Sequence, residues 1–288
     1  MAGLADYFAD WKPAPDFTED VIGEAPAAAL AAVLDVPRTA PAEGEPLPPL
    51  WHWLYFLEAP AQRELGADGH PAHGRFLPPI PDRTRMFAGG RLRVEHPLLV
   101  GRSAERRSEL ADVAIKQGRS GELAFVTVRH EVRQLDRTCL VEEQDLVYRS
   151  GRATRPERTA SAPAAAQASL SGDRQLTLTP DPVLLFRFSA LTGNAHRIHY
   201  DEPYARHVEG YPGLVVHGPL LAVAMLETVR RHHSGRRVAA LSYRLRAPVF
   251  AGEQVRCDAE LTGADGDSAV LSTRVADTLA ASAVVELR

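Results

Sequence analysis

Two segments of this 288-residue chain resemble one another, and the repeat limits the folds that the chain can adopt. The first segment, Gly90–Gly101, reads GRLRVEHPLLVG, and the second, Tyr243–Gly252, reads YRLRAPVFAG. Aligning Val100 with Ala251 gives an offset of 151 residues, close to half of the chain. Internal self-similarity is typical of related structural units. We therefore expect two halves that repeat one arrangement of strands.

Both repeats are followed by runs in which apolar and polar residues alternate. These runs include Leu123–Val132 and Leu140–Tyr148 in the first half, and Ala269–Val275 and Ala283–Leu287 in the second. A period of two is typical of strands that bury one face. Each half is therefore predicted to end in consecutive strands that form an antiparallel meander.

Each half also has one strongly apolar helix ahead of its strands. In the second half it covers Pro219–Val229, where Pro219 suits the first helical position and Gly218 precedes it as a cap. The segment is apolar nearly all round, so the helix is predicted to be buried. Pro26–Leu34 is its predicted counterpart in the first half. One buried helix wrapped by a curved antiparallel sheet, present twice, predicts an α+β double hot-dog fold.

A segment rich in Ala, Ser, Arg and Pro, residues 151–182, separates the two halves. It has no sustained apolar period, which is typical of a linker. The predicted organisation is a first half at residues 1–150, a linker at 151–182 and a second half at 183–288. Since the histidine-rich motif described below lies only in the second half, we expect the first half to bind substrate and to be non-catalytic.

Charge and composition exclude several classes of protein. The formal net charge is −4, with 33 Lys and Arg against 37 Asp and Glu, which argues against a main role in binding nucleic acid. Two cysteines, Cys139 and Cys257, are too few for a disulfide framework or a cysteine-based zinc site. No run reaches the roughly 20 apolar residues of a membrane span, and Met1–Trp11 has no secretory pattern. We expect a cytoplasmic protein that binds neither membranes nor nucleic acid.

The candidate site lies in residues 186–221, which read FRFSALTGNAHRIHYDEPYARHVEGYPGLVVHGPLL. Histidines gather there, and histidine is the side chain best suited to proton transfer near neutral pH. His196 and His199 could share a metal with Asp201, but no HExxH pattern is present and we expect no metal. Covalent catalysis is also disfavoured, because there is no GxSxG turn and neither cysteine adjoins a histidine.

Two parts of this segment carry a family resemblance. Phe188–Asp201, FSALTGNAHRIHYD, and Gly213–Leu220, GLVVHGPL, resemble the hydratase-2 motif of the MaoC-like hydratases and dehydratases. The first half contains PPLWHWLYFL, ELGADGHP, FLPP and MFAGGRL, which resemble the branch of type 2 hydroxyacyl-thioester dehydratases and of mesaconyl-C4-CoA and itaconyl-CoA hydratases. The resemblance implies a double hot-dog fold and a hydro-lyase that adds water to an enoyl thioester or removes it. It implies no cofactor, since coenzyme A is part of the substrate.

The resemblance also implies roles for single residues. His199 matches the catalytic histidine of the motif, and Asn194 stands at the position of the catalytic aspartate. Gly218 matches the glycine whose N–H binds the thioester carbonyl, while His196 and His217 are supporting candidates. Asn194 departs from the broad motif, because an amide cannot take up a proton at physiological pH.

Physical arguments support the same roles. The start of a buried helix has unpaired N–H groups and the positive end of the helix dipole. A thioester carbonyl that accepts from the N–H of Gly218 would have its developing enolate charge stabilised there. In the resulting hypothesis His199 takes a proton from water, and Asn194 orients that water. A structural role for His199 and a simple capping role for Gly218 stay open as alternatives.

Candidates for substrate binding lie in the first half. The residues Trp51, His52 and Trp53 either line the acyl pocket or fill the core. A dicarboxylic acyl group needs a cation for its free carboxylate, and guanidinium groups pair well with carboxylates. The candidates for that cation are Arg83, Arg85 and Arg91. The alternative for these arginines is a solvated position on the surface.

The leading hypothesis is a hydratase of a C5 dicarboxylic acyl-CoA such as mesaconyl-C4-CoA or itaconyl-CoA. The alternative enzyme is a 3-hydroxyacyl-thioester dehydratase of fatty-acid or polyketide type, with a CoA or acyl-carrier-protein substrate. A third alternative is a non-catalytic hot-dog protein that binds an acyl thioester, which the amide of Asn194 keeps open. The expected partner is the acyl-CoA substrate, and a homodimer is left open.

Overall fold

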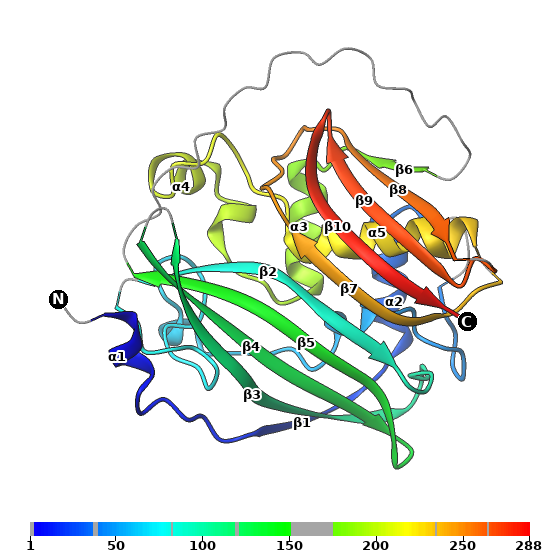
Figure 1. Cartoon of the computed structure of the whole chain (residues 1–288), viewed down its shortest axis with the longest axis horizontal. Helices are drawn as coiled ribbons and strands as arrows, with labels where there is room; N and C mark the ends of the chain where they lie inside the picture. The colour runs from blue at the N-terminus through cyan, green and yellow to red at the C-terminus, as the bar shows by residue number, and fades with distance from the viewer. Residues whose placement is uncertain are drawn as a thin grey trace.

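The computed structural model describes residues 3–36, 40–81, 83–118, 121–150, 175–233, 235–263 and 265–288 (Figure 1). Within these residues one antiparallel sheet has the strand order β1-β3-β4-β5-β2-β7-β10-β9-β8-β6. The strands are β1 (Asp16–Val21), β2 (Arg83–Val94), β3 (Ser103–Gly118), β4 (Gly121–Gln134), β5 (Arg137–Ser150), β6 (Gln175–Leu178), β7 (Val238–Leu245), β8 (Val255–Thr262), β9 (Ser268–Val275) and β10 (Thr278–Leu287). The helices are α1 (Leu4–Phe8), α2 (Glu24–Val33), α3 (Pro182–Leu191), α4 (Glu202–His207) and α5 (Gly218–His232), with short 3-10 helices η1 (Trp51–Leu54), η2 (Gln62–Glu64) and η3 (Arg197–His199).

The sheet consists of two similar groups of strands that meet where β2 pairs with β7 (Figure 1). Strands β1 to β5 lie on one side of this seam and β6 to β10 on the other, in mirrored order. In each group the last three strands of the chain are neighbours, as expected for a meander. The prediction of a double hot-dog fold is confirmed.

Matching turns show that the two halves are structurally related. The N–H of Gly101 donates to the carbonyl oxygen of Ile22, directly after β1, at 2.7 Å. The N–H of Gly252 donates to the carbonyl oxygen of Pro180, shortly after β6, at 2.8 Å. In both halves a backbone hydrogen bond therefore joins the turn after the central strand, β2 or β7, to the end of the edge strand, β1 or β6. The 151-residue offset in the sequence reflects this repeated geometry.

Helix α5 is buried against the second half of the sheet, as its apolar sequence predicts. Every residue from Leu220 to Val229 is buried, and the helix packs against β6, β8, β9, β10 and β2. The helix begins one residue earlier than the sequence predicts, with Gly218 as its first residue and His217 in place of Gly218 as the N-cap. Pro219 is tolerated in the first turn, because the first N–H groups of a helix have no partner within it. At 15 residues α5 is the longest helix of the described residues, and none of these helices is long and apolar enough to cross a membrane.

Helix α2 forms where the sequence predicts a helix, but it is not the counterpart of α5. It follows the edge strand β1 as α3 follows the edge strand β6, and it packs against α3 and η1. In element order α2 therefore corresponds to α3. The second half has α5 between α3 and its central strand, whereas the described residues between α2 and β2 contain only the short helices η1 and η2.

Proline explains why no long helix forms at that place in the first half. Proline lacks the N–H of a helical hydrogen bond and clashes with the preceding turn. The segment from residue 48 to the start of β2 contains Pro48, Pro49, Pro60, Pro71, Pro78, Pro79 and Pro81. Instead of a helix, this segment packs irregularly over the first-half strands.

The predicted linker is only partly described. Residues 151–174 lie outside the described residues. Gln175–Leu178, which the sequence analysis assigned to the linker, instead forms β6 and pairs with β8. The reason is the alternation in QLTL, which provides a short edge strand, and the cap at Asp181, whose Oδ1 accepts from the N–H of Leu184 at 2.7 Å. The division into a first and a second half stays a prediction.

An ion-pair cluster joins the end of α5 to the end of α2. Glu227 is 1% exposed, and its Oε2 lies 2.7 Å from Nη2 of Arg230 and 3.6 Å from Nε of Arg231. The Nη2 of Arg231 donates to the carbonyl oxygen of Leu34, just after α2, at 2.8 Å. A buried carboxylate of this kind is stable only while its cationic partners remain in place.

We expect Glu227→Gln to lower the free energy of unfolding by about 3 kcal/mol, since it leaves two arginines partly buried without their carboxylate. Urea unfolding followed by circular dichroism measures the change. The matched control is Glu286→Gln, because Glu286 is exposed and should change stability by less than about 0.5 kcal/mol. Equal effects of the two substitutions would contradict a structural role for the cluster.

Candidate active site

An irregular stretch between α3 and η3 carries the centre of the motif. The N–H of Asn194 donates to the carbonyl oxygen of Ser189 at 2.9 Å, and its Oδ1 accepts from the N–H of His196 at 3.0 Å. The backbone from Asn194 to His199 is therefore a loop followed by one 3-10 turn. The hypothesis requires such a backbone, because five residues of α-helix would point Asn194 and His199 about 140° apart.

Four imidazole rings follow one another beside this loop. The ring centroids are 4.1 Å apart for His70 and His196, 5.6 Å for His196 and His199, and 3.6 Å for His199 and His217. His217 caps α5, and its Nε2 lies 2.8 Å from Oγ of Ser189. The row of rings thus joins three parts of the chain: the motif with His196 and His199, the start of α5 with His217, and the first half with His70.

His199 is held as a neutral imidazole. Its Nδ1 lies 2.7 Å from the carbonyl oxygen of Val215, which can only accept, so Nδ1 carries the proton and Nε2 has a free lone pair. Burial lowers the pKa of His199 to about 4, although the hydrogen bond to Val215 acts in the opposite direction. A neutral imidazole with a free nitrogen is suited to act as a general base.

Gly218 begins α5 at a crowded position. A Cβ atom at this residue would lie 2.2 Å from Cδ1 of Leu245 and 3.6 Å from Cδ1 of Phe87, so a side chain would displace Leu245. The N–H of Gly218 has no hydrogen-bond partner among the described residues. It is the first N–H of a buried helix, where the helix dipole favours an oxygen that gains negative charge.

A first-half segment, residues 66–71 and here called the docking loop, packs directly on the motif. The carbonyl oxygen of Asp68 accepts from the N–H of Arg197 at 2.8 Å. Gly69 has a φ of 90°, and a Cβ atom there would lie 1.9 Å from the carbonyl oxygen of Ala195. Only glycine combines this backbone conformation with so close an approach. The docking loop is therefore fixed against the motif.

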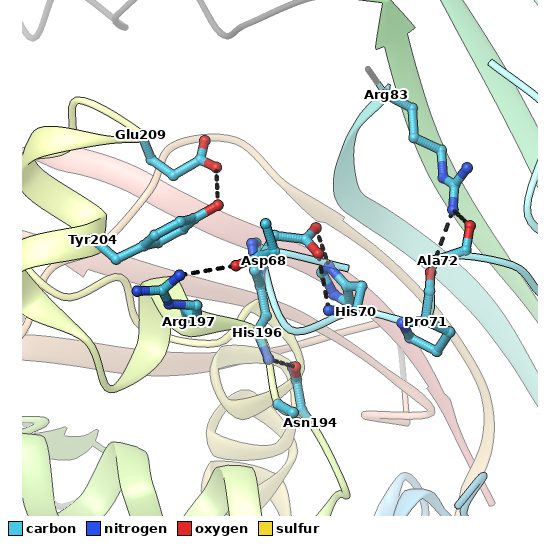
Figure 2. Close-up of polar contacts among 12 residues, drawn as sticks. Asp68, His70, Pro71, Ala72, Arg83, Asn194, His196, Arg197, Tyr204 and Glu209 are labelled. Atoms are coloured by element: carbon cyan, nitrogen blue, oxygen red, sulfur yellow. Dashed lines mark hydrogen bonds and ion pairs between the residues drawn. The ribbon is translucent and has the colours of Figure 1, made fainter. Parts of the chain in front are cut away.

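The docking loop brings an aspartate–histidine pair to the site (Figure 2). The Oδ2 of Asp68 lies 3.1 Å from Nδ1 of His70, and the Oδ1 of Asp68 accepts from the N–H of His70 at 3.0 Å. Sequence reasoning did not select either residue. The signal for them in the sequence is the segment ELGADGHP, which belongs to the family resemblance of the first half.

A cavity of about 490 Å³ opens beside the docking loop and extends over β2 to β5 of the first half. It occupies the region that no long helix covers among the described residues. The residues predicted from the sequence that line it are His52, Trp53, Arg85 and Asn194. The predicted residues that do not line it are Trp51, Arg83, Arg91, His196, His199, His217 and Gly218. Pro219, next to Gly218, does line it.

Three of the residues proposed for substrate binding have other contacts. Trp51 is 1% exposed and belongs to the core, so the alternative of core filling holds for this residue. Arg83 donates to carbonyl oxygens in the segment before β2 (Figure 2). Arg91 forms ion pairs with Glu143 and Asp145 at 2.8 and 3.0 Å. Of the three predicted arginines, only Arg85 faces the cavity.

A buried carboxylate lies at the first-half end of the cavity. Glu142 accepts from Nε1 of Trp53 at 2.8 Å, and its other oxygen lies 2.9 Å from Nε2 of His52. Burial acts to raise the pKa of Glu142, but the charge of His52 and the hydrogen bonds from both residues lower it overall. Both carboxylate oxygens therefore have partners, and Glu142 stays ionised.

Arg106 lines the same end of the cavity and forms no ion pair with any described residue. Its Nε is buried without a hydrogen-bond partner, and its guanidinium carbon lies 5.3 Å from the ring centre of Phe56. Beside it, Oγ of Ser108 lies 2.8 Å from Nδ1 of His130. The sequence does not predict this polar region, because burial of a charged residue on an exposed-looking strand leaves no local signal.

One group of residues in the described part of the chain has the spacing of a metal site. Ligand atoms of Asp68, His70 and His196 all lie within 4.8 Å of one another. Carboxylate and imidazole ligands suit divalent transition metals. However, Nδ1 of His70 is already hydrogen-bonded to Asp68, so a metal would have to replace that contact or use the other ring nitrogen.

Comparisons with known proteins agree on one family. Residues 50–251 match the model of hydroxyacyl-thioester dehydratase type 2. The chain is 48% identical over 279 residues to mesaconyl-C(4)-CoA hydratase of Chloroflexus aurantiacus, covering 93% of this chain and 97% of that protein. It is 26% identical to the mitochondrial hydroxyacyl-thioester dehydratase type 2 of Schizosaccharomyces pombe, covering 75% and 79% of the two chains. A MaoC-like dehydratase from Phytophthora capsici has the same fold, with a TM-score of 0.66 at 11% identity and 98% of each chain covered.

The neutral histidines predict that the protein loses stability in mild acid. In the folded protein the pKa values of His199 and His130 are lowered to about 4. In the unfolded chain both histidines have the usual pKa of about 6.5, so below this pH the unfolded chain takes up protons that the folded protein does not. The free energy of unfolding should therefore fall as pH decreases from 6.5 to 4, by about 1.4 kcal/mol per pH unit for each histidine.

Urea unfolding between pH 4.5 and 7.5 measures this slope, and His199→Gln should reduce it by the share of one histidine. An unchanged slope in this variant would show that His199 is protonated normally in the folded protein.

Proposed function

Because the chain belongs to the hydroxyacyl-thioester dehydratase type 2 family, we propose that it adds water to the double bond of an enoyl-CoA, with mesaconyl-C4-CoA as substrate. The observation that carries the proposal is the 48% identity with a mesaconyl-C(4)-CoA hydratase over nearly the whole of both chains. The cavity beside Asn194 supports it, since it supplies a place for the acyl group at the motif. We expect the reaction to need no cofactor, because coenzyme A belongs to the substrate. We also propose that the protein acts in the cytoplasm.

The proposed roles follow from the hydrogen bonds of each residue. Nε2 of His199 takes a proton from water, because Nδ1 is committed to the carbonyl of Val215. Asn194 orients that water with its amide N–H₂, because its Oδ1 already accepts from the backbone. The N–H of Gly218 donates to the thioester carbonyl and stabilises the enolate that forms when water attacks the β-carbon. His196 and His217 support the ring of His199, since the ring of His217 stacks on it and the ring of His196 meets it edge to face.

The free carboxylate of the substrate must lie close to the reacting atoms. In mesaconyl-C4-CoA that carboxylate is attached to the β-carbon, which is the atom that water attacks. The cation that binds it therefore has to be near the motif, and Arg85 is the cavity-lining arginine whose charge acts on His70 and His196. We assign Arg85 to the carboxylate. Guanidinium groups bind carboxylates through two parallel hydrogen bonds.

The first-half end of the cavity argues against the fatty-acid alternative. A long alkyl chain would have to pass beside Arg106, Glu142 and His130, which line the cavity. Glu142 is already buried with both oxygens partnered, but Arg106 forms no ion pair with a described residue. Covering its guanidinium with an alkyl chain would remove water and supply no hydrogen bond in return, which costs free energy. A short acyl group with a polar end avoids this cost.

We expect His199→Ala to reduce turnover of mesaconyl-C4-CoA at least 10²-fold, the usual size of a general-base contribution. Loss of the enoyl-thioester absorbance measures the rate, and circular dichroism checks the fold. His207→Ala is the matched control, since His207 is an exposed histidine on the neighbouring helix α4. Hydration at the wild-type rate by the His199 variant would remove that residue from the mechanism.

We expect Arg85→Gln to reduce the hydration of mesaconyl-C4-CoA more than that of a substrate without a free carboxylate. The kcat/KM for this substrate should fall by about 10- to 100-fold, in keeping with about 1.5–3 kcal/mol for hydrogen bonds to a charged group. The kcat/KM for crotonyl-CoA, which has no free carboxylate, should change much less. Arg91→Gln serves as control, because Arg91 is paired outside the cavity. A parallel loss with both substrates would contradict the assignment.

A further inference from the structure

We propose that His70, oriented by Asp68, is a second acid–base residue of the hydration reaction and exchanges the proton of the substrate α-carbon. The inference rests on the proposed function, because it names a further catalytic residue for that reaction. None of the roles carried by the motif requires a residue of the first half. The docking loop nevertheless places an aspartate–histidine pair at the motif (Figure 2).

Hydration of an enoyl thioester needs two proton transfers. One proton leaves the attacking water, and another reaches the α-carbon. Asn194 lines the cavity but cannot exchange protons, because its side chain is an amide. His199 has one free nitrogen and does not line the cavity in this structure. A second titratable group that faces the cavity at the motif would complete the reaction.

His70 has the geometry for this task. It lines the cavity together with Gly69, Asn194 and Ala195. Its Nδ1 bonds to the carboxylate of Asp68 at 3.1 Å, while Nε2 has no hydrogen-bond partner among the described residues. A carboxylate on one ring nitrogen fixes the tautomer and the ring orientation and leaves the other nitrogen for the substrate.

The pair is held rigidly, as a catalytic group must be. Within the docking loop, the N–H of Gly66 donates to the carbonyl oxygen of His70 at 2.7 Å. Against the motif, Asp68 and Ala67 accept from the backbone and the side chain of Arg197 at 2.8 and 3.0 Å. The ring of His70 also contacts the ring of His196, with centroids 4.1 Å apart.

Charges around the pair allow His70 to take up and release a proton. The hydrogen bonds and charge of His70 outweigh the effect of burial and lower the pKa of Asp68 to about 2, so its carboxylate is ionised and stabilises an imidazolium. Burial lowers the pKa of His70, the hydrogen bond and the charge of Asp68 oppose this effect, and the charges of Arg85 and Arg83 add to it, so the net shift is downward. A substrate carboxylate bound to Arg85 would offset the charge of that arginine and favour protonated His70.

The proton balance of the step is complete. In the hydration direction the water oxygen bonds to the β-carbon as one water proton passes to Nε2 of His199. The electron pair of the double bond moves to the α-carbon and the thioester carbonyl, and the α-carbon takes a proton from Nε2 of protonated His70. One proton then returns from His199 to His70 through solvent, so the net change is the addition of one water molecule. Dehydration runs through the same groups in reverse.

The test compares His70→Gln, His70→Ala and the matched control His73→Ala on mesaconyl-C4-CoA. His73 is an exposed histidine close to the docking loop. Both His70 variants should lose at least 10²-fold in kcat, with KM nearly unchanged, and the control should keep wild-type kinetics. The His70→Gln variant can keep a polar contact with Asp68, so it tests the role of His70 even if His70→Ala destabilises the docking loop. Added imidazoles should restore the Ala variant at rates that depend on the pKa of each imidazole.

Asp68→Asn tests the positioning residue through its pH profile. Removing the carboxylate destabilises protonated His70, so the decline of kcat for hydration at high pH should begin at a lower pH than in the wild type. A structural effect of this substitution would reduce kcat without moving the profile.

Each failure has its own signature. Wild-type protein that hydrates no enoyl-CoA would overturn the proposed function, and this inference with it. Active wild-type protein with His70 variants within about threefold of its kcat would overturn only the role of His70. A loss of kcat in the His70→Ala variant that added imidazoles do not restore would also overturn the role of His70. So would wild-type activity that EDTA removes and Zn²⁺ restores, because Asp68, His70 and His196 would then be metal ligands.

Discussion

The antiparallel pairing of β2 with β7 is the interaction on which the rest of the structure depends. It joins the two halves into one sheet, with Gly89–Arg93 opposite Ala240–Arg244. Gly89 has a φ of 149°, and a Cβ atom there would lie 2.3 Å from the carbonyl oxygen of Tyr243, so this close pairing needs glycine. The same pairing sets Phe87 of β2 against the start of α5. The N-terminus of the buried helix thereby meets the cavity of the other half.

The two halves share strand order, and in the proposed mechanism they divide the work of the site. The second half supplies α5 and the motif, whose imidazoles are kept neutral by burial. The first half has no long helix at the matching place among its described residues, and this leaves a cavity over its strands. The docking loop closes the arrangement, because it sets Asp68 and His70 against the loop that contains Asn194. In this account one active centre requires both halves.

The sequence predicts those features that depend on local periodicity or on a motif. Alternation located β4, β5, β9 and β10, and the apolar run after Pro219 located α5, because buried elements repeat their apolar residues at a fixed spacing. The relation of α2 to α3 could not be read in this way, since it depends on the order of elements around the sheet. The sequence does not single out His70 and Arg106, because the contacts that define them come from residues distant in the chain: His196 of the motif lies against His70, and Phe56 lies against Arg106. Arg83, Arg85 and Arg91 look alike in sequence, and only their packing separates them.

The central claim is that the acyl thioester lies between the start of α5 and the docking loop. A crystal structure with a bound saturated analogue of mesaconyl-C4-CoA tests this claim most directly, since the analogue cannot undergo hydration. The account predicts the thioester carbonyl oxygen within hydrogen-bond distance of the N–H of Gly218, the free carboxylate on Arg85, and the α-carbon facing Nε2 of His70. An acyl group bound at the Arg106 end of the cavity, out of contact with Gly218 and His70, would contradict it.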